Sequence, residues 1–308
     1  MAAPDSRTRI TLVGAGTIGL SFAALHLAYV ASPTQLSIVD TRPDLEEYVR
    51  STLPKYLAPA LHGLISSIRL SASLPDAVRD ADVIQEQGPE NLAFKATVWK
   101  EVVQHAKPDA LLWSSTSGIT ATSQAEAAAL DDAAAARLLV VHPYNPPHVM
   151  PLLEVVLGSR TSSETVERTV SFWRARQREP VVLKRECKGF VANRLAFALL
   201  REAVHLVNEG VVGVEEVDRI VETSMGPRWA VAGPFKSYHV GGGAGGLEGF
   251  FKNIGGTVQE CWQDGGQVNV GEEWEQTISR QAREAYGTVD VESRDRRTKA
   301  VLDAARSA

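Results

Sequence analysis

Residues 9–20 of the chain have the sequence RITLVGAGTIGL, and this stretch decides the fold around it. The β-branched run Ile10–Val13 predicts a short strand, and the apolar run Leu20–Leu27 predicts a helix. The turn between them follows a G-x-G-x-x-G pattern and consists of Gly14, Ala15, Gly16, Thr17, Ile18 and Gly19. Strand, glycine turn and helix in this order are typical of a dinucleotide-binding fold. The alternative is a tight strand-to-helix turn that binds nothing.

Each glycine has its own purpose in such a loop. Gly14 allows the sharp turn, Gly16 leaves no side chain between the backbone and a pyrophosphate, and Gly19 lets the helix pack close to the strand. The free N–H groups at the helix start face the phosphates, where the positive end of the helix dipole also lies. We therefore expect this loop to bind the pyrophosphate of a dinucleotide.

A carboxylate at the end of the next predicted strand completes the pattern. The strand Gln35–Val39 is followed by Asp40, which lies 21 residues after Gly19. A carboxylate at this distance accepts hydrogen bonds from a ribose 2′-hydroxyl and repels a 2′-phosphate, which predicts NAD as the cofactor rather than NADP. Arg42 weakens this preference, because a guanidinium attracts a phosphate.

The composition is that of an acidic globular protein. The chain has 308 residues, of which 44% are hydrophobic and 22% charged, with a formal net charge of −5. This fits two domains and not a basic nucleic-acid-binding surface. No apolar run approaches the ~20 residues of a membrane span, and the start MAAPDSRTRI has no apolar signal-peptide core. Cys187 and Cys261 form neither a disulfide framework nor a zinc motif, so we expect a cytoplasmic protein without a metal site.

Strand and helix patterns alternate through the first part of the chain. Further strands are predicted at 67–70, 81–85, 110–114, 137–141, 152–156 and 181–183. Helices are predicted at 43–64, with interruptions at Pro54 and Pro59, and at 90–103 and 125–136. This alternation predicts an α/β domain built on a Rossmann-type doubly wound sheet.

The pattern changes near residue 185. A long helical pattern covers 190–210 and ends at a glycine, and the rest of the chain is helical without strand alternation. We predict an NAD-binding Rossmann domain at 1–187, followed by an all-helical C-terminal domain at 188–308. The glycine-rich segment 241–246 is either a flexible loop or a mobile lid, and its composition favours the loop.

Two polar residues stand where polar groups are awkward. His142 follows an apolar strand at its carboxyl end, where open α/β sheets bind ligands. Glu154 lies inside the apolar run Leu152–Val156, where a carboxylate without a partner loses several kcal/mol of hydration. The 12 residues between them allow the chain to turn back, so that Glu154 can fix the tautomer of His142 and stabilise its imidazolium form. The alternatives are a capping histidine and a solvent-facing edge-strand glutamate.

Asn193 and Ser117 are weaker candidates. Asn193 lies on the apolar face of the predicted helix with Phe197 and Leu200, so its amide either pins two helices or binds a substrate oxygen. Ser117 lies in a T-S-G turn after a predicted strand. Turn serines are usually structural, and its candidacy depends on its neighbours.

The chain resembles a known family through six motifs in order. They are the glycine loop with Asp40, QE at 85–86 with PENL at 89–92 and Lys95, STS at 115–117, HPYNP at 142–146, LEVV at 153–156 and GFVANRL at 189–195. Together they are similar to the 3-hydroxyacyl-CoA dehydrogenase superfamily, over nearly the whole chain. They look most like its short-substrate branch, which contains L-gulonate 3-dehydrogenase (lambda-crystallin) and carnitine dehydrogenase.

This resemblance implies roles for the polar residues. It implies that His142 is the catalytic base, that Glu154 orients it, and that Ser117 and Asn193 hold the reacting oxygen. The residues implied to line the nicotinamide side of the cofactor are Glu90, Lys95, Ser117 and Asn145. By the same similarity, the first domain binds NAD, the helical domain forms a homodimer, and the active site lies in the cleft between the domains.

The substrate side departs from the acyl-CoA pattern. The segment TRPDLEEYVRS after Asp40 is acidic, whereas the acyl-CoA enzymes carry serine and lysine contacts to CoA there. The segment MGPRWA at 225–230 is instead similar to one in the short-substrate branch, and its Arg228 can clamp a free carboxylate bidentately. The alternative for Arg228 is a surface salt bridge.

These features predict an NAD-dependent oxidoreductase that interconverts a small 3-hydroxy acid and its 3-keto acid by hydride transfer. One alternative is a keto or imine reductase, or a 3-hydroxyacyl-CoA dehydrogenase, on the same scaffold. Another is a non-catalytic, crystallin-like structural protein. The sequence leaves the particular substrate open.

Overall fold

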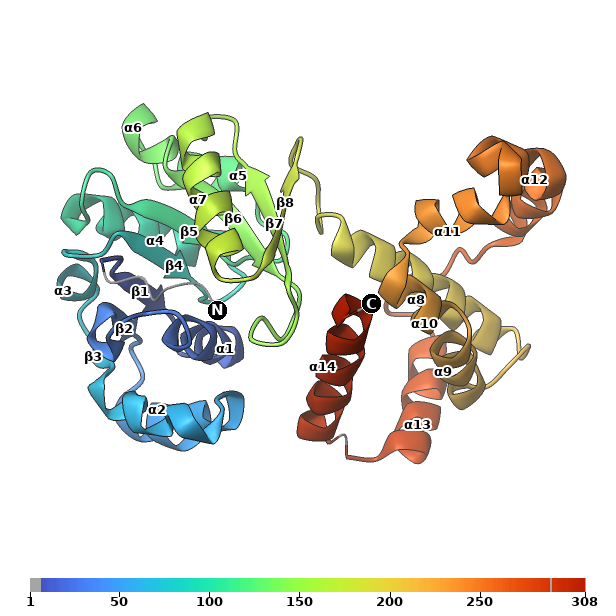
Figure 1. Cartoon of the computed structure of the whole chain (residues 1–308), viewed down its shortest axis with the longest axis horizontal. Helices are drawn as coiled ribbons and strands as arrows, with labels where there is room; N and C mark the ends of the chain where they lie inside the picture. Colours follow the sequence, from blue (N-terminus) through green and yellow to red (C-terminus); the bar gives the residue numbers. More distant parts are fainter. Residues whose placement is uncertain (1–6, 289, 308) are drawn as a thin grey trace. The chain divides into compact units, whose positions relative to one another are not determined.

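A computed structural model describes residues 7–288 and 290–307 (Figure 1). Residues 1–6 belong to the N-terminal segment in which we expect no signal peptide, and they lie outside the described residues. By its internal contacts the chain divides into two units, the first ending at Asn193 and the second beginning at Arg194. The predicted domain boundary after residue 187 lies slightly earlier, before the long helix that leads into the second unit.

The first unit is built on a sheet with the strand order β3-β2-β1-β4-β5-β6-β7-β8. The strands are β1 Ile10–Val13, β2 Leu36–Val39, β3 Arg69–Ser71, β4 Val83–Glu86, β5 Leu111–Ser114, β6 Leu138–Pro143, β7 Leu152–Leu157 and β8 Glu179–Leu183. Strands β1 to β6 are parallel, whereas β7 runs antiparallel to β6 and parallel to β8. The Rossmann-type sheet is confirmed, and its order reverses between β1 and β4, where such sheets bind ligands.

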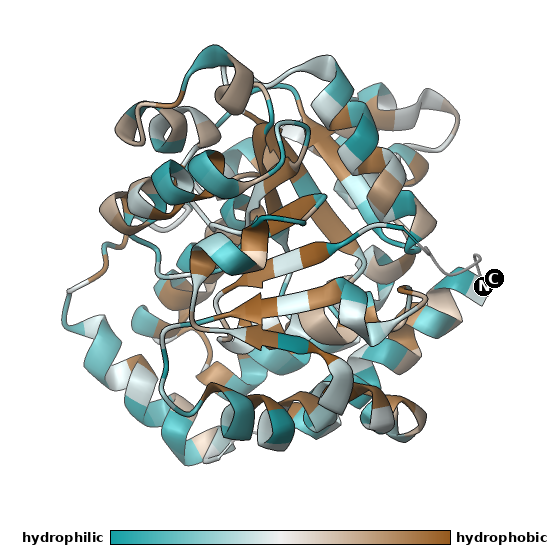
Figure 2. Ribbon diagram, turned by 90° about the vertical axis from the view of Figure 1, so that its left-hand side faces the viewer, coloured by the Kyte–Doolittle hydropathy of each residue, from teal (hydrophilic) through white to brown (hydrophobic). Residues whose placement is uncertain are grey.

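Helices cover both faces of this sheet. They are α1 Thr17–Leu27, α2 Leu45–Thr52, α3 Leu74–Val78, α4 Leu92–His105, α5 Ala121–Ala127, α6 Asp132–Ala135 and α7 Ser163–Ala175, with the 3₁₀ turns η1 Pro33–Gln35, η2 Leu53–Tyr56 and η3 Pro59–Ser67. Side chains of α1 and α7 belong to one buried apolar cluster, and those of α3 to α6 belong to the other. Figure 2 shows apolar strands in the middle of this unit and polar residues on the outer sides of its helices.

One predicted helix of this unit is divided in two by the structure. The alanine-rich segment 125–136 forms two helices, because Ala129 takes a left-handed conformation (φ 51°) and Asp131 begins a new helix by accepting a hydrogen bond from the N–H of Ala134 at 2.8 Å. A capping carboxylate therefore outweighs the helix propensity of alanine here. The segment 43–64 is interrupted at Pro54 and Pro59 as predicted: its start forms α2, and each proline stands near the first position of a 3₁₀ turn.

The second unit contains helices and no strand among its described residues, as predicted. Its helices are α8 Ala192–Asn208, which begins at the end of the first unit, α9 Val214–Thr223, α10 Met225–Val231, α11 Pro234–Gly241, α12 Gly246–Asp264, α13 Trp274–Tyr286 and α14 Val291–Ser307. The glycine-rich segment 241–246 is a short connection between α11 and α12 that contains the 3₁₀ turn η4 Gly243–Gly245. Among the described residues, none of the helices has the length and apolarity that a membrane crossing requires.

Candidate active site

The glycine loop has the geometry that a pyrophosphate requires. Gly14 has φ +108°, and a Cβ on it would lie 3.1 Å from the carbonyl oxygen of Gln87. A Cβ on Gly19 would lie 2.0 Å from the carbonyl oxygen of Gly14, so this position admits only glycine. Around Gly16 the space is open, because a Cβ there would meet nothing within 4 Å. Since α1 begins directly after Gly16, its free N–H groups face that space, and the loop fits a dinucleotide phosphate.

Asp40 stands at the carboxyl end of β2, as the ribose-binding carboxylate of such a fold does. Its Oδ2 accepts the N–H of Ala15 at 2.7 Å and its Oδ1 accepts the N–H of Arg42 at 3.0 Å. The guanidinium of Arg42 donates to both carboxylate oxygens of Asp44, at 2.8 and 3.2 Å, and lies over the ring of Tyr48. This cation is therefore already engaged, which reduces its attraction for a 2′-phosphate.

His142 and Glu154 are brought together by the pairing of β6 with β7. The two residues are opposite each other in the antiparallel ladder, and His142 Nδ1 lies 2.8 Å from Glu154 Oε2. Both are almost fully buried, with 4% and 2% of their surfaces exposed. His142 Nε2 makes no hydrogen bond with any residue in the described part of the chain. The pair therefore presents one free imidazole nitrogen at the carboxyl edge of the sheet, with the other nitrogen held by a carboxylate.

The second oxygen of Glu154 holds the start of α8. Its Oε1 accepts the N–H groups of Val191 and Ala192, at 2.8 and 3.0 Å. The helix begins at Ala192 and not at Phe190 as predicted, because the chain first turns through a left-handed residue, Phe190, with φ 51°. The Phe190 side chain is fully buried, and its ring centroid lies 5.1 Å from that of His142. One carboxylate thus positions both the imidazole and the helix that carries Asn193.

These contacts determine the charge of Glu154. Burial alone raises the pKa of a carboxyl group, but the hydrogen bonds from His142 and from the N–H groups of Ala192 and Val191 outweigh it and lower the pKa of Glu154 below its ordinary value. The group is therefore a carboxylate at neutral pH. Its Oε2 accepts from His142 Nδ1–H, which leaves the lone pair of a neutral ring on Nε2.

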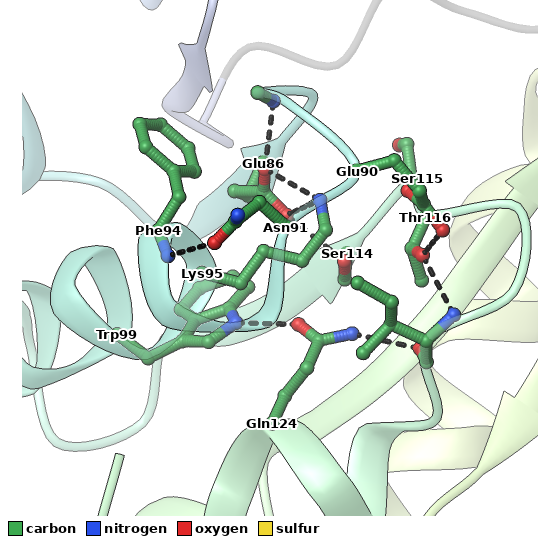
Figure 3. Close-up of polar contacts among 12 residues, drawn as sticks. Glu86, Glu90, Asn91, Phe94, Lys95, Trp99, Ser114, Ser115, Thr116 and Gln124 are labelled. Carbon is green, nitrogen blue, oxygen red and sulfur yellow. Dashed lines mark hydrogen bonds and ion pairs between the residues drawn. The ribbon is translucent and has the colours of Figure 1, made fainter. Parts of the chain in front are cut away.

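The turn that carries Ser117 is anchored by Glu90 (Figure 3). Glu90 Oε1 accepts the hydroxyl of Thr116 at 2.5 Å and the N–H of Gly118 at 3.0 Å. Ser117 itself is exposed and forms no hydrogen bond with the described residues. In this structure Glu90 therefore holds the serine turn in place, and its predicted contact with the cofactor stays a prediction. Thr116 has no predicted role, because its only signal in the sequence is its place after a strand.

Lys95 forms a buried ion pair with Glu86, which is also drawn in Figure 3. Its ammonium donates to both oxygens of Glu86, at 2.9 and 2.8 Å, and Glu86 also accepts the hydroxyl of Ser114 and the N–H of Gly88. Both charged side chains are buried, and removing either one would leave an uncompensated charge in the core. The predicted contact of Lys95 with the cofactor stays a prediction, and the structure gives this residue a role in holding the ends of β4 and β5.

The remaining candidates are less constrained. Asn145 follows β6 and is exposed, and Asn193 is half-buried in the first turn of α8. Asn193 shares the apolar face of α8 with Phe197 and Leu200, whose side chains are 60% and 57% exposed in the described chain. In the second unit, Arg228 is exposed on α10 and forms no ion pair with a described residue. The described residues also contain no group of three His, Cys, Asp or Glu side chains placed to hold a metal ion.

Three features together are those of an NAD-dependent dehydrogenase. They are the Rossmann sheet, the glycine loop that fits a pyrophosphate, and an imidazole held by a carboxylate at the same edge of the sheet. The chain belongs to the 3-hydroxyacyl-CoA dehydrogenase family. Residues 9–187 match the model of that family's NAD binding domain, and residues 189–264 match the model of its C-terminal domain.

Individual relatives agree with this family. The chain is 39% identical to an L-carnitine dehydrogenase of Oceanobacillus iheyensis over 64% of its own length and 62% of that protein's length. It is 35% identical to an L-carnitine dehydrogenase of Pseudomonas putida over 81% and 78%. With a 3-hydroxyacyl-CoA dehydrogenase of Gibberella moniliformis it shares 34% identity over 83% and 79%.

Two solved structures are similar over almost the whole chain. An NAD-dependent 5-formyl-3-hydroxy-2-methylpyridine 4-carboxylic acid 5-dehydrogenase has 27% identity and a TM-score of 0.78, covering 98% of this chain and 99% of that one. A 3-hydroxyacyl-CoA dehydrogenase of Archaeoglobus fulgidus has 27% identity and a TM-score of 0.67, covering 97% and 98%.

Proposed function

We propose that this dehydrogenase oxidises the secondary alcohol of a small, free 3-hydroxy acid to the 3-keto acid, and catalyses the reverse reaction. The observation that carries the proposal is the buried His142–Glu154 pair, whose Nε2 has no partner among the described residues. The relatives named L-carnitine dehydrogenase support it, because carnitine is itself a small 3-hydroxy acid. The direct test is formation of NADH from free 3-hydroxy acids compared with a 3-hydroxyacyl-CoA thioester.

In this mechanism His142 moves the proton. Bound NAD supplies the acceptor for the hydride that leaves the carbinol carbon. His142 Nε2 takes the hydroxyl proton as the C=O bond forms, and Glu154 stabilises the imidazolium across the 2.8 Å contact. Ser117 and Asn193 are proposed to hold the reacting oxygen while its charge changes, a contribution on the order of 10²–10³ in rate for one donor. In the reverse direction the imidazolium returns the proton to the alkoxide.

The surface after Asp40 supports a free acid over a CoA thioester. It forms an open hollow of about 660 Å³ whose lining residues are Pro43, Asp44, Glu46, Glu47, Arg50 and Ser51. Three of these are carboxylates, whose charges repel the phosphates of CoA. A thioester substrate is the second candidate, because one relative is named 3-hydroxyacyl-CoA dehydrogenase.

Arg228 is proposed to clamp the substrate carboxylate. Replacing Arg228 with Met is expected to raise KM for the free acid about 10- to 100-fold, the value of a charge-assisted hydrogen bond, while kcat changes little. Arg228→Lys restores only part of the affinity because an ammonium cannot bind bidentately. The control is Arg219→Met on the exposed side of α9, and steady-state kinetics give both constants. An unchanged KM in the Arg228→Met enzyme refutes the clamp.

Asp40 is proposed to select NAD over NADP. The wild-type kcat/KM is expected to be higher with NAD, and Asp40→Ala should lower it with NAD and raise it with NADP, because repulsion of the 2′-phosphate is lost. Asp44→Asn is the informative companion, since it frees the guanidinium of Arg42 while leaving Asp40 in place. That variant should gain activity with NADP only. A wild-type preference for NADP contradicts the assignment.

We further propose a cytoplasmic homodimer formed through the helical unit. The apolar side chains of Leu195, Phe197 and Leu200 on α8 are exposed in the described chain, and a second copy would bury them. Light scattering on the purified chain measures the mass directly. A monomer at micromolar concentration would exclude this assembly.

A further inference from the structure

Three polar side chains in the first unit form a hydrogen-bonded relay, which runs from the core to the carboxyl edge of the sheet. His26 lies on α1, Gln85 on β4, and Ser115 directly after β5. His26 Nε2 is 3.2 Å from Gln85 Oε1, and Gln85 Nε2 donates to Ser115 Oγ at 3.2 Å. His26 and Gln85 are fully buried, whereas Ser115 is half-buried. None of the three takes part in the proton transfer described above.

His26, the first residue of this relay, is electrically neutral. His26 packs against the rings of Phe22, Phe172 and Trp173. Burial, together with the nearby charge of Arg176, lowers the pKa of His26 to about 3. A neutral imidazole carries one N–H, and its Nδ1 has no partner among the described residues. The proton is therefore on Nε2, where it faces the carbonyl oxygen of Gln85.

This proton sets the direction of every later hydrogen bond. Because Gln85 Oε1 accepts from His26, the NH₂ group of Gln85 points to Ser115. The oxygen of Ser115 accepts that hydrogen bond, so its own hydroxyl proton is left to donate elsewhere. No described residue accepts it. Ser115 therefore presents a donor at the carboxyl end of β5, and the backbone there is fixed because Ser115 N–H donates to the carbonyl of Glu86 at 2.8 Å.

The position of Ser115 identifies the part of the cofactor that it would meet. The sheet has the order β2-β1-β4-β5, with Asp40 after β2 and the glycine loop after β1. If Asp40 binds the adenosine ribose and the loop binds the pyrophosphate, the opposite side of the loop, at β4 and β5, receives the nicotinamide riboside. That half carries several acceptor oxygens, in the ribose and in the carboxamide.

We propose that Ser115 donates a hydrogen bond to the nicotinamide riboside half of NAD, and that His26 and Gln85 are positioning residues that fix this polarity. The inference rests on the use of NAD stated above. It deepens the cofactor site by adding a contact and a buried relay to the glycine loop and Asp40. If the relay only held the strands together, its loss would lower the stability of the fold and leave the affinity for the cofactor unchanged.

The test is the affinity of the protein for NADH, measured by fluorescence titration, and for ADP, measured by calorimetry. Ser115→Ala is expected to raise the Kd for NADH about five- to tenfold, which is the loss of affinity that one missing hydrogen bond causes. The Kd for ADP should stay within twofold, because ADP lacks the nicotinamide riboside. Ser123→Ala on α5 removes another half-buried, hydrogen-bonded serine of the same unit and should leave both Kd values unchanged.

Changes at Gln85 test the relay itself. Gln85→Glu can only accept, so it captures the proton of Ser115 and should weaken NADH binding as much as Ser115→Ala does. If the buried carboxylate prevents folding, Gln85→Met removes the donor with little change in volume. It should weaken NADH binding less than Ser115→Ala, and the double variant should bind no worse than Ser115→Ala alone.

Three results would overturn the proposal. They are an unchanged Kd for NADH in Ser115→Ala, an equal loss of affinity for NADH and ADP, and additive effects in the double variant. If the wild-type protein itself does not bind NADH, the assignment of NAD fails first, and this outcome is distinct from the other three.

Discussion

Replacing His142 with Gln is expected to lower kcat by about 10²- to 10⁴-fold, which is the range that a general base contributes. Glutamine keeps the size and polarity of the side chain, but its amide cannot take up the hydroxyl proton as the imidazole Nε2 does. Its amide can still contact Glu154, so the local structure is retained. The loss should therefore appear in kcat and not in cofactor affinity, which depends on the glycine loop and Asp40.

The measurement combines steady-state kinetics with NADH titration. The Kd for NADH should stay within about twofold of the wild-type value, because His142 belongs neither to the glycine loop nor to the Asp40 site. His105→Gln, at the exposed end of α4, is a matched control and should retain full activity. Wild-type kcat in the His142→Gln enzyme would remove this residue from the mechanism.

Replacing Glu154 with Gln should have a comparable effect for a different reason. The amide oxygen of Gln can still accept the N–H groups of Val191 and Ala192, so the start of α8 is kept. Its NH₂ group, however, would then donate to His142 Nδ1. The imidazole is held in the tautomer that carries its proton on Nε2, and this tautomer cannot take a proton from the substrate. A fall in kcat of roughly 10³–10⁴-fold is expected, as for a mis-held base in a catalytic triad.

Stability separates this tautomer effect from a folding defect. Glu154→Gln should lose only the stability that the charge of the carboxylate adds, whereas Glu154→Ala also leaves two N–H groups without their acceptor and should cost about 3–5 kcal/mol. Glu186→Gln is the control, since Glu186 also accepts a backbone N–H, that of Thr122 at 3.0 Å. Full activity in Glu154→Gln would show that the carboxylate only supports the helix.

The pH dependence follows from the lowered pKa of Glu154. A folded-state pKa below the unfolded value adds stability that is present above the ordinary pKa of 4.5 and is lost as the pH falls through the lower folded value. The wild type should therefore lose this part of its stability below pH 4.5, and Glu154→Gln should lack it at every pH. Thermal melts of both proteins at several pH values measure the difference.

Much of the fold follows from local sequence patterns. The strand and glycine turn at 10–19, the apolar strands and the change to helices near residue 185 are all periodic or turn-based signals, and they predict the sheet and the helical unit. The break at Asp131 was missed because alanine propensity dominated the prediction, and the delayed start of α8 because nothing in the sequence marks the left-handed Phe190.

The site was predictable only where the sequence shows an anomaly. His142 and Glu154 are polar groups in apolar strands, and the strand pairing places them in contact. The roles of Glu90 and Lys95 in holding the serine turn and the strand ends depend on partners 9 to 28 positions away. The relay from His26 to Ser115 crosses separations of 59 and 30 residues, which no local pattern reports.

The most direct test of the proposed function is the rate of NADH formation by the purified chain with NAD and a panel of alcohols. The panel contains L-carnitine, L-gulonate and 3-hydroxybutyrate as free acids, and 3-hydroxybutyryl-CoA as a thioester. We predict turnover of at least one free acid, with no comparable rate on the thioester. Turnover of the thioester alone would contradict the account.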